Sequence, residues 1–214
     1  LLEWKVLKNE AASPGGECRD NDPRFDDRRL RDSVDFNGFM GSELHHLAKI
    51  ARMVGRAEDA EAFEERHRRL KTIYQEQLWS ETDGFPWDRD ISDGSPLKLR
   101  TNAAFVALFG RLLEPGQAAD LIEKHLSDPS AFWTPLPVPT VARDESCYEP
   151  DMFRGAVWMP CNFLIFHGLL NYGHTGLAKQ LAERSVASLR RWFERGGSLY
   201  EFFDPDDTVS PRHL

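Results

Sequence analysis

The sequence has no long apolar run, few cysteines and no excess of positive charge. No stretch approaches the ~20 apolar residues that a membrane-spanning helix needs, and residues 1–10 lack the apolar core of a signal peptide. Three cysteines cannot all pair with one another and none lies in a CxxC, which favours a reducing, cytoplasmic compartment. The formal net charge of -8 disfavours a nucleic-acid partner, because phosphate binding needs unopposed Lys and Arg. We therefore expect neither a membrane nor a nucleic acid as partner.

Short motifs that mark several common chemistries are also missing. There is no HExxH, no pair of CxxC motifs and no spaced histidine cluster, so no metal site is predicted. His45 and His46 are adjacent on a predicted helix and point apart, while His167 lies in an apolar helix, which favours surface or core roles. The glycine-rich loops of nucleotide sites and the GxSxG of serine hydrolases are absent as well. No cofactor is predicted.

Hydrophobic periodicity predicts helices that come in pairs. Within each pair a mostly apolar helix precedes an amphipathic, charged one, which suits a buried inner layer covered by an outer layer. This is the pattern of an all-α toroid of helical hairpins, although a plain helical bundle or a solenoid fits the same pattern. A Gly- and Asp-rich stretch at 81–96 is expected to be a loop or a short strand pair. The predicted helical segments are 34–54, 57–78, 101–113, 115–127, 155–173 and 175–195.

Four loop segments combine carboxylates with aromatic residues or arginine. They are 17–27, 84–90, 151–158 and 198–207. Sugar sites need this mixture, because carboxylates and arginines bind hydroxyls while aromatic rings pack on the apolar faces of sugars. Each segment taken alone is also compatible with an ordinary turn and a core aromatic residue. The combination of all four indicates a carbohydrate site between the hairpins.

Five short segments in the same order carry a resemblance to a known family. Its members have an SG-x-DNSPR-[FWY]-D segment, and residues 20–26 (DNDPRFD) stand in that place. Residues 35–39 (DFNGF) match a DLN-x-F segment, 87–90 (WDRD) match an aromatic-Asp-x-Asp segment, 153–158 (FRGAVW) match WRGPVW, and 200–205 (YEFFDP) match YEYY-[DN]-P. The chain thus resembles the trehalase and glucosidase I group of inverting α-glycosidases. It is most similar to glycoside hydrolase family 63, which includes bacterial mannosylglycerate and glucosylglycerate hydrolases.

The resemblance implies an (α/α)6 barrel and a hydrolase that cleaves an α-glycosidic bond with inversion, without a redox cofactor. Asp20 would be the general acid and Glu201 the general base. The substrate would be a small sugar molecule such as glucosylglycerate, mannosylglycerate or a gluco-oligosaccharide. Its expected contacts, some of which would equally support the acid loop, are Asn21, Arg24, Asp35, Trp87, Asp88, Arg154, Gly155, Trp158 and Tyr200.

The chain departs from the family pattern in detail and in length. Glu17-Cys18 replaces the SG before the acid, Arg19 stands where the family has Met or Trp, and Ala156 replaces proline. The six predicted helices are half of the roughly twelve that a six-hairpin barrel needs. Residues 1–214 are therefore expected to be the C-terminal part of the catalytic barrel domain, with its remaining half or a second copy as partner.

Two other functions remain open from the sequence. One is a non-catalytic helical scaffold that has kept the loop shapes. The other is a lyase or an epimerase on the same toroid, for which Tyr148, Tyr200 and His174 would be the proton carriers to test.

Overall fold

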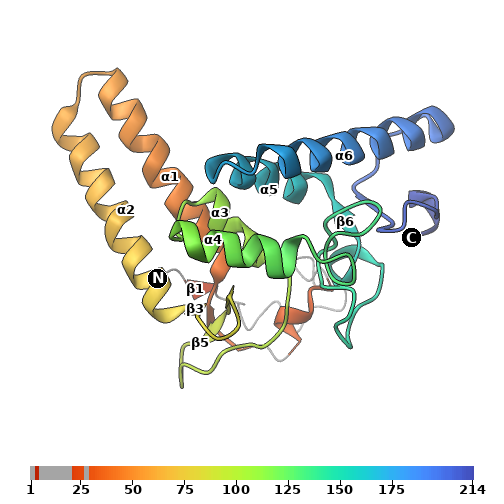
Figure 1. Ribbon diagram of the computed structural model, residues 1–214, viewed down its shortest axis with the longest axis horizontal. Coiled ribbons are helices and arrows are strands. Elements are labelled where there is room, and N and C mark those ends of the chain that lie inside the picture. The colour runs from red at the N-terminus through yellow and green to blue at the C-terminus, as the bar shows by residue number, and fades with distance from the viewer. Residues whose placement is uncertain (1–2, 5–20, 27–28) are drawn as a thin grey trace, which may run out of the picture.

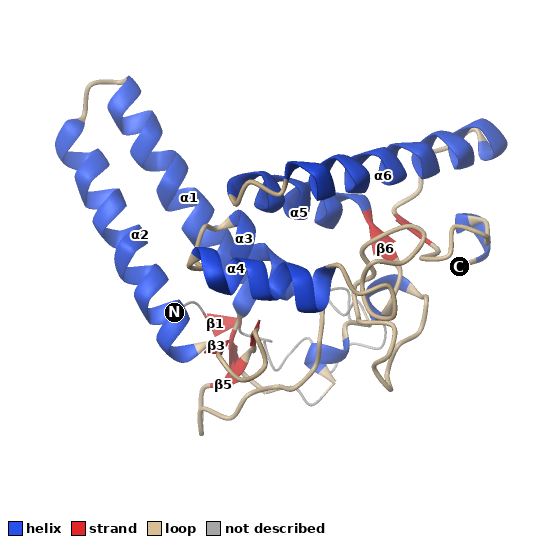
Figure 2. Ribbon diagram, viewed as in Figure 1, coloured by secondary structure: helices blue, strands red, loops and turns tan. Residues whose placement is uncertain are grey.

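Six α-helices dominate the part of the chain that the structure, a computed structural model, describes: residues 3–4, 21–26 and 29–214. α1 (Val34–Met53) and α2 (Ala57–Gln77) form the first hairpin, and α5 (Met159–Asn171) and α6 (Thr175–Gly196) form the third. Between them lie α3 (Val106–Phe109) and α4 (Pro115–Leu121). The hairpins fan out side by side, and the loops and strands gather at one end of the fan (Figures 1 and 2). The predicted pairing of helices is confirmed.

The first helices of the three hairpins form one layer. α3 packs between α1 and α5, while α2 covers α1 and α6 covers α5. The close approach of α1 and α3 requires glycine, because a Cβ atom at Gly110 would overlap the backbone of Gly38, and one at Gly41 would lie 2.6 Å from the Gly110 carbonyl oxygen. Gly168 of α5 meets Leu108 of α3 in the same way. This glycine contact brings the inner helices close enough to share one core.

Amphipathic outer helices cover that layer as their sequence pattern predicts. Along α6, Leu181, Ser185 and Trp192 are buried, whereas Val186 and Phe193 are exposed. α4 begins with Pro115 in its first turn, and Glu114 and Gln117 complete a capping box there. The helix continues as a π-helical turn at Ile122–Leu126, so the predicted segment 115–127 is helical throughout nearly all of its length.

Two helical predictions are wrong in their bounds. The segment 101–113 is not one helix but a 3-10 turn (Asn102–Phe105) followed by the single turn of α3, because the backbone leaves the helical conformation at Arg111, whose φ is 58°. The segment 155–173 does not begin as a helix. Val157–Trp158 form strand β6, and α5 starts at Met159 with Pro160 in its first turn.

Short antiparallel strands join the loops at the end of the fan where these loops gather, which we call the open end. β1 (Glu3–Trp4), β2 (Arg31–Asp32) and β5 (Arg89–Asp90) form a sheet in that order. β3 (Trp79–Ser80) pairs with β4 (Phe85–Pro86), so the predicted loop or strand pair at 81–96 contains β4 and β5, which belong to different sheets. β6 pairs with β7 (Phe202–Phe203), with Val157 opposite Phe203 and Trp158 opposite Phe202. The remaining short helices are 3-10 turns at Pro23–Phe25, Met152–Arg154 and Pro211–His213. The described residues of the four segments singled out in the sequence (21–26, 84–90, 151–158 and 198–207) lie at the same end of the molecule as these pairings.

Candidate active site

Arg24 is the centre of a nearly buried charge cluster at the open end. Its guanidinium lies 3.0 Å from a carboxylate oxygen of Asp22, 3.0 Å from one of Asp35 and 3.5 Å from one of Asp88. The four side chains are between 6% and 15% exposed. Asp22 caps the 3-10 turn by accepting from the Arg24 backbone N–H, Asp35 lies in the first turn of α1, and Asp88 accepts from the N–H of Val34. Three carboxylates therefore surround the Arg24 guanidinium: one from the loop before the 3-10 turn, one from the start of α1 and one from the segment between β4 and β5.

Three carboxylates around one guanidinium give the cluster an excess of negative charge, and the pKa values reflect this. Burial raises the pKa of Asp88 to about 6, against the opposing attraction of Arg24. Burial also acts to raise the pKa of Asp35, but the charge and hydrogen bond of Arg24 outweigh it and the pKa of Asp35 is lowered. The pKa of Arg24 itself is raised well above its usual value, because the three carboxylates overcome the effect of burial. The cluster is thus poised to hold a proton on Asp88 in mildly acidic solution.

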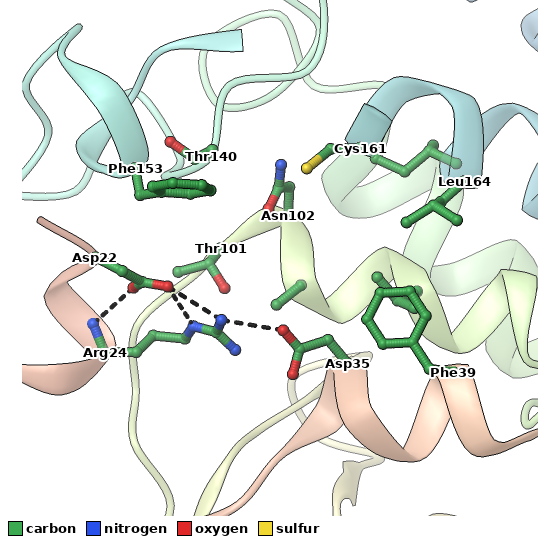
Figure 3. A pocket seen from close by; sticks show the side chains of 13 residues that line it. Asp22, Arg24, Asp35, Phe39, Thr101, Asn102, Thr140, Phe153, Cys161 and Leu164 are labelled. Carbon is green, nitrogen blue, oxygen red and sulfur yellow. Dashed lines mark hydrogen bonds and ion pairs between the residues drawn. The ribbon is translucent and has the colours of Figure 1, made fainter. Parts of the chain in front are cut away.

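A cavity of about 110 Å³ lies beside the cluster (Figure 3). The Asp22, Arg24 and Asp35 side chains form its charged end, while Phe39 and Leu164 stand at the opposite end. The wall between them carries hydroxyl and amide groups that can bind a polyol. The residues that complete the lining are Thr101, Asn102, Ala103, Val106, Thr140, Phe153, Cys161 and Ile165.

The segment Asp151–Arg154 ties the residues after Asp20 to the far side of this cavity. Asn21 accepts from the Phe153 N–H at 2.8 Å and donates to the Asp151 carboxylate at 3.0 Å and its carbonyl at 3.3 Å. Arg154 donates to both carboxylate oxygens of Asp26, at 2.6 and 2.8 Å. Both ends of residues 21–26 are therefore bonded to residues 151–154, about 130 positions further along the chain.

Three aromatic rings, which we call the ring column, run from the cavity to β7. Phe153 of the cavity wall stacks on Trp158 with ring centroids 4.1 Å apart, and Trp158 stacks on Phe202 at 5.5 Å. The Trp158 indole N–H donates to the Met152 carbonyl at 3.0 Å. The column thus connects the cavity wall to the strand that follows Glu201.

Glu201 lies on the loop that leads from α6 into β7, and its side chain is exposed. It makes no hydrogen bond or ion pair with any residue that the structure describes. Asp22, Asp35, Asp88 and Asp151 are, in contrast, all bonded. Among the described carboxylates of these segments, Glu201 is therefore the one without a hydrogen-bonded or ion-paired partner.

The other sequence-predicted residues occupy supporting places. The Trp87 ring is buried between Phe85 and the Lys98 ammonium, with its indole N–H on the Asp83 carboxylate. Gly155 permits close contact with residues 148–149, because a Cβ there would lie 2.6 Å from the Tyr148 ring.

Tyr200 accepts a hydrogen bond from the Arg212 guanidinium at 2.8 Å. Trp133 is partly buried against the core with the Arg184 guanidinium over its ring. Asp20 lies outside the described residues.

Several cavity residues were not selected from the sequence. Thr101, Asn102 and Cys161 belong to apolar segments that are typical of core, and Thr140 lies in a Pro-rich loop with no recognisable motif. Asp22, Phe39 and Phe153 did have a signal, because each lies in one of the five segments that match the family. Within the part of the chain that is described, no group of three His, Cys, Asp or Glu side chains is placed to hold a metal ion. The described helices likewise include none that is both long and apolar enough to cross a membrane.

Comparisons with known proteins agree with this arrangement. Residues 5–209 match the model of the mannosylglycerate hydrolase MGH1-like glycoside hydrolase domain. The chain is 30% identical over 192 residues to a mannosylglycerate hydrolase from Rubrobacter radiotolerans, covering 85% of this chain and 42% of that protein. It is 25% identical to a periplasmic trehalase from Pseudomonas aeruginosa, in a match that covers 80% of this chain and 30% of that enzyme. The chain thus spans less than half of these curated relatives.

Solved structures give the same result for the fold. The GH63 mannosylglycerate hydrolase from Thermus thermophilus in complex with glucose superimposes with a TM-score of 0.70 at 27% identity, over 82% of this chain and 42% of that chain. The neutral trehalase Nth1 from Saccharomyces cerevisiae, at 18% identity, shares the fold with a TM-score of 0.71. The helical hairpins are those of an (α/α)6 toroid, and the match covers 42% and 35% of the lengths of these two proteins. The resemblance predicted from the five segments is confirmed, and the chain belongs to the MGH1-like family of glycoside hydrolase domains.

Proposed function

We propose that the protein hydrolyses an α-glycosidic bond with inversion in a small glycoside. Glucosylglycerate, mannosylglycerate and gluco-oligosaccharides are the first substrates to test, because the relatives named above are mannosylglycerate hydrolases and a trehalase. Asp20 protonates the leaving oxygen, and Glu201 activates a water molecule on the other face of the sugar. For this reaction the two carboxyl groups should stand roughly 6.5–9.5 Å apart, whereas a separation of about 5 Å would favour a reaction that retains the anomeric configuration.

The free carboxylate of Glu201 is the observation that carries this proposal. A general base needs a carboxylate oxygen open to accept a proton from water, and each arginine or N–H that already binds the carboxylate lowers its basicity. Glu201 meets this requirement within the described part of the chain, while the carboxylates around Arg24 do not. The YEFFDP segment that contains Glu201 is the one whose glutamate is the base in the family that the sequence resembles.

The cavity beside Arg24 supports binding of an uncharged sugar ring. Arg24 and Asp35 line it directly, so we assign them to sugar hydroxyls, with Thr101, Asn102 and Thr140 as further hydrogen-bonding groups. We assign the other predicted contacts (Asn21, Trp87, Asp88, Arg154, Gly155, Trp158 and Tyr200) to the support of the loops, since each is engaged with protein groups or packed closely against them.

We also propose that further helical hairpins cover the open side of the toroid. Phe39, Leu47 and Ile50 of α1 and Phe163 of α5 are between 37% and 61% exposed. Large apolar side chains gathered on inner helices normally face another part of the protein. The additional hairpins would come from the same polypeptide or from a second copy, and light scattering of the purified protein distinguishes the two.

The proposed function is tested by a hydrolysis screen against glucosylglycerate, mannosylglycerate, trehalose and α-linked glucobioses. On the best substrate, Asp20→Asn and Glu201→Gln should each lower kcat by at least about 100-fold, the lower end of what general acid–base catalysis contributes. Glu194→Gln, an exposed glutamate on α6, is the matched control and should leave kcat unchanged. Proton NMR of the first product should show the β-anomer. Activity that survives in both Asp20→Asn and Glu201→Gln would refute the assignment.

A further inference from the structure

We propose that Trp158 is a positioning residue, which holds Glu201 and the residues after Asp20 in a fixed relation, and not a ring on which the sugar stacks. The inference rests on the proposed function and names the contacts that set the geometry of its two carboxyl groups. It follows from an unbroken path of contacts between Asn21 and Phe202, each of which directly neighbours one proposed catalytic residue in the sequence.

The surroundings of Trp158 leave little of its indole for a ligand. Phe153 stacks on it at 4.1 Å with 19° between the ring planes, and Phe202 at 5.5 Å with 28°. Its N–H is bonded to the Met152 carbonyl, and the residue is 9% exposed. A sugar that stacks on tryptophan needs an open aromatic face. This indole instead fills the space between two protein segments.

On one side, Trp158 fixes the backbone beside Glu201. Trp158 and Phe202 are opposite each other in the β6–β7 ladder, so their ring contact and the backbone pairing act on the same residue pair. Glu201 precedes Phe202 directly, and its own carboxylate has no partner among the described residues. Its position is therefore set by the adjoining backbone, and the ladder with its ring contact is what holds that backbone.

On the other side, Trp158 fixes the segment that binds Asn21. Met152 has a φ of 40°, a conformation that is unfavourable for a residue with a side chain and is kept only when neighbouring contacts impose it. The Trp158 N–H on the Met152 carbonyl is one such contact, and the stacked Phe153 ring is another. The Phe153 N–H then reaches the Asn21 amide oxygen at 2.8 Å. A shift of the indole would therefore move both parts of the path: the acid arm, from Trp158 through Phe153 to Asn21, and the base arm, from Trp158 to Phe202.

The two arms can be separated by the leaving group of the substrate. A methyl α-glycoside needs full protonation of its leaving oxygen, whereas the 4-nitrophenyl α-glycoside of the same sugar needs little, and both need an activated water. Asn21→Ser, on the acid arm, should lower kcat on the methyl glycoside. On the nitrophenyl glycoside its kcat should be close to that of the parent protein. Phe202→Leu, on the base arm, should lower kcat on both to the same extent.

Trp158→Phe should lower kcat on both substrates by roughly 10- to 100-fold, because displacement of a catalytic group by about 1 Å costs up to that factor. KM should stay within about 3-fold of the parent value, since a positioning residue does not contact the sugar. Trp79→Phe is the matched control. It is the same substitution at a buried tryptophan, in the main core cluster and away from the β6–β7 ladder. It should lower Tm by a similar amount and leave kcat within about 3-fold.

Either of two results would overturn the inference alone. One is a rise in KM for Trp158→Phe with kcat unchanged, which indicates sugar contact. The other is a kcat for Trp158→Phe equal to that of Trp79→Phe. A parent protein that cleaves none of the α-glycosides in the screen would overturn the proposed function, and this inference with it. Trp158→Phe keeps a ring at the centre of the column and Asn21 lies outside the hydrophobic core, so these two variants carry the test even if Phe202→Leu does not fold.

Discussion

Replacing Arg24 by methionine should destabilise the protein strongly, and more at neutral than at acidic pH. The substitution keeps most of the side-chain volume but leaves Asp22, Asp35 and Asp88, all at most 15% exposed, without their cation. Removing one partner of a buried ion pair typically costs about 3–5 kcal/mol, because the remaining charge stays buried without compensation. We expect Arg24→Met to lower the free energy of unfolding by an amount within this range at about pH 7.5.

The pH dependence follows from the sign of each pKa shift. The pKa of Asp88 is raised to about 6 from an ordinary value of 3.8, so the folded state binds its proton more tightly than the unfolded state does. This contribution is favourable in acid and is lost as the pH rises from about 4 to about 6. The lowered pKa of Asp35 acts in the opposite direction and depends on Arg24. Without the guanidinium, both pKa values should rise, and each unit is worth about 1.4 kcal/mol.

Urea unfolding, followed by tryptophan fluorescence, measures the effect. The loss caused by Arg24→Met should be about 1–3 kcal/mol smaller near about pH 5 than near about pH 7.5, because protonation relieves the buried carboxylates. Adding Asp88→Asn to Arg24→Met should restore part of the loss at the higher pH. Arg68→Met removes an exposed ion pair with Glu65 and should cost less than about 1 kcal/mol at both pH values. A loss for Arg24→Met that is equally small, or that does not change with pH, would refute the reasoning.

Two further predictions concern packing and thiol chemistry. Gly110→Ala should lower the free energy of unfolding by about 1–3 kcal/mol, because the added Cβ would overlap the backbone of Gly38. Gly116→Ala is the control: its Cβ would have no atom within 4 Å, so it should stabilise the protein slightly. Thermal unfolding compares the two variants. Burial raises the pKa of Cys161 to about 11. Iodoacetamide should therefore label it only slowly at about pH 7.5 and faster as the pH rises, and peptide mass spectrometry measures this labelling. Rapid labelling at neutral pH would contradict the prediction.

The helices that were predicted correctly are those whose pattern is local. α1, α2 and α6 are each 20 residues or longer and amphipathic, so a few turns of sequence contain the whole signal. Strand β6 failed because Val157 and Trp158 are apolar in an apolar stretch, and their partners in β7 lie about 45 positions away. α3 failed because the backbone turns out of the helix at Arg111, where Asn171 of α5 binds both the Arg111 side chain and the Phe109 carbonyl. In both cases a tertiary contact overrides the local pattern.

The candidate site shows the same division. The motif order was enough to select Arg24, Asp35 and Asp88, but the sequence could not show that all three share one buried cluster, since Asp88 lies 64 positions from Arg24. It also could not distinguish carboxylates that are bonded from one that is free. Asp151 and Glu201 stand in similar loops beside aromatic residues, yet of these two only Glu201 lacks a partner among the described residues.

That difference is a consequence of the toroid itself. Each inner helix begins at the end of the fan where the loops gather, and the loops before, between and after the hairpins bring 21–26, 151–154 and 200–203 there from three parts of the chain (Figure 1). Buried carboxylates in these loops are stabilised by arginine or by backbone N–H groups, because an unpaired buried charge is costly. An unpaired carboxylate must therefore remain exposed, and its position must come from the backbone beside it. Glu201 satisfies both conditions through the pairing of Phe202 with Trp158, so rigidity of the ladder, and not burial, is what a catalytic role at this position requires.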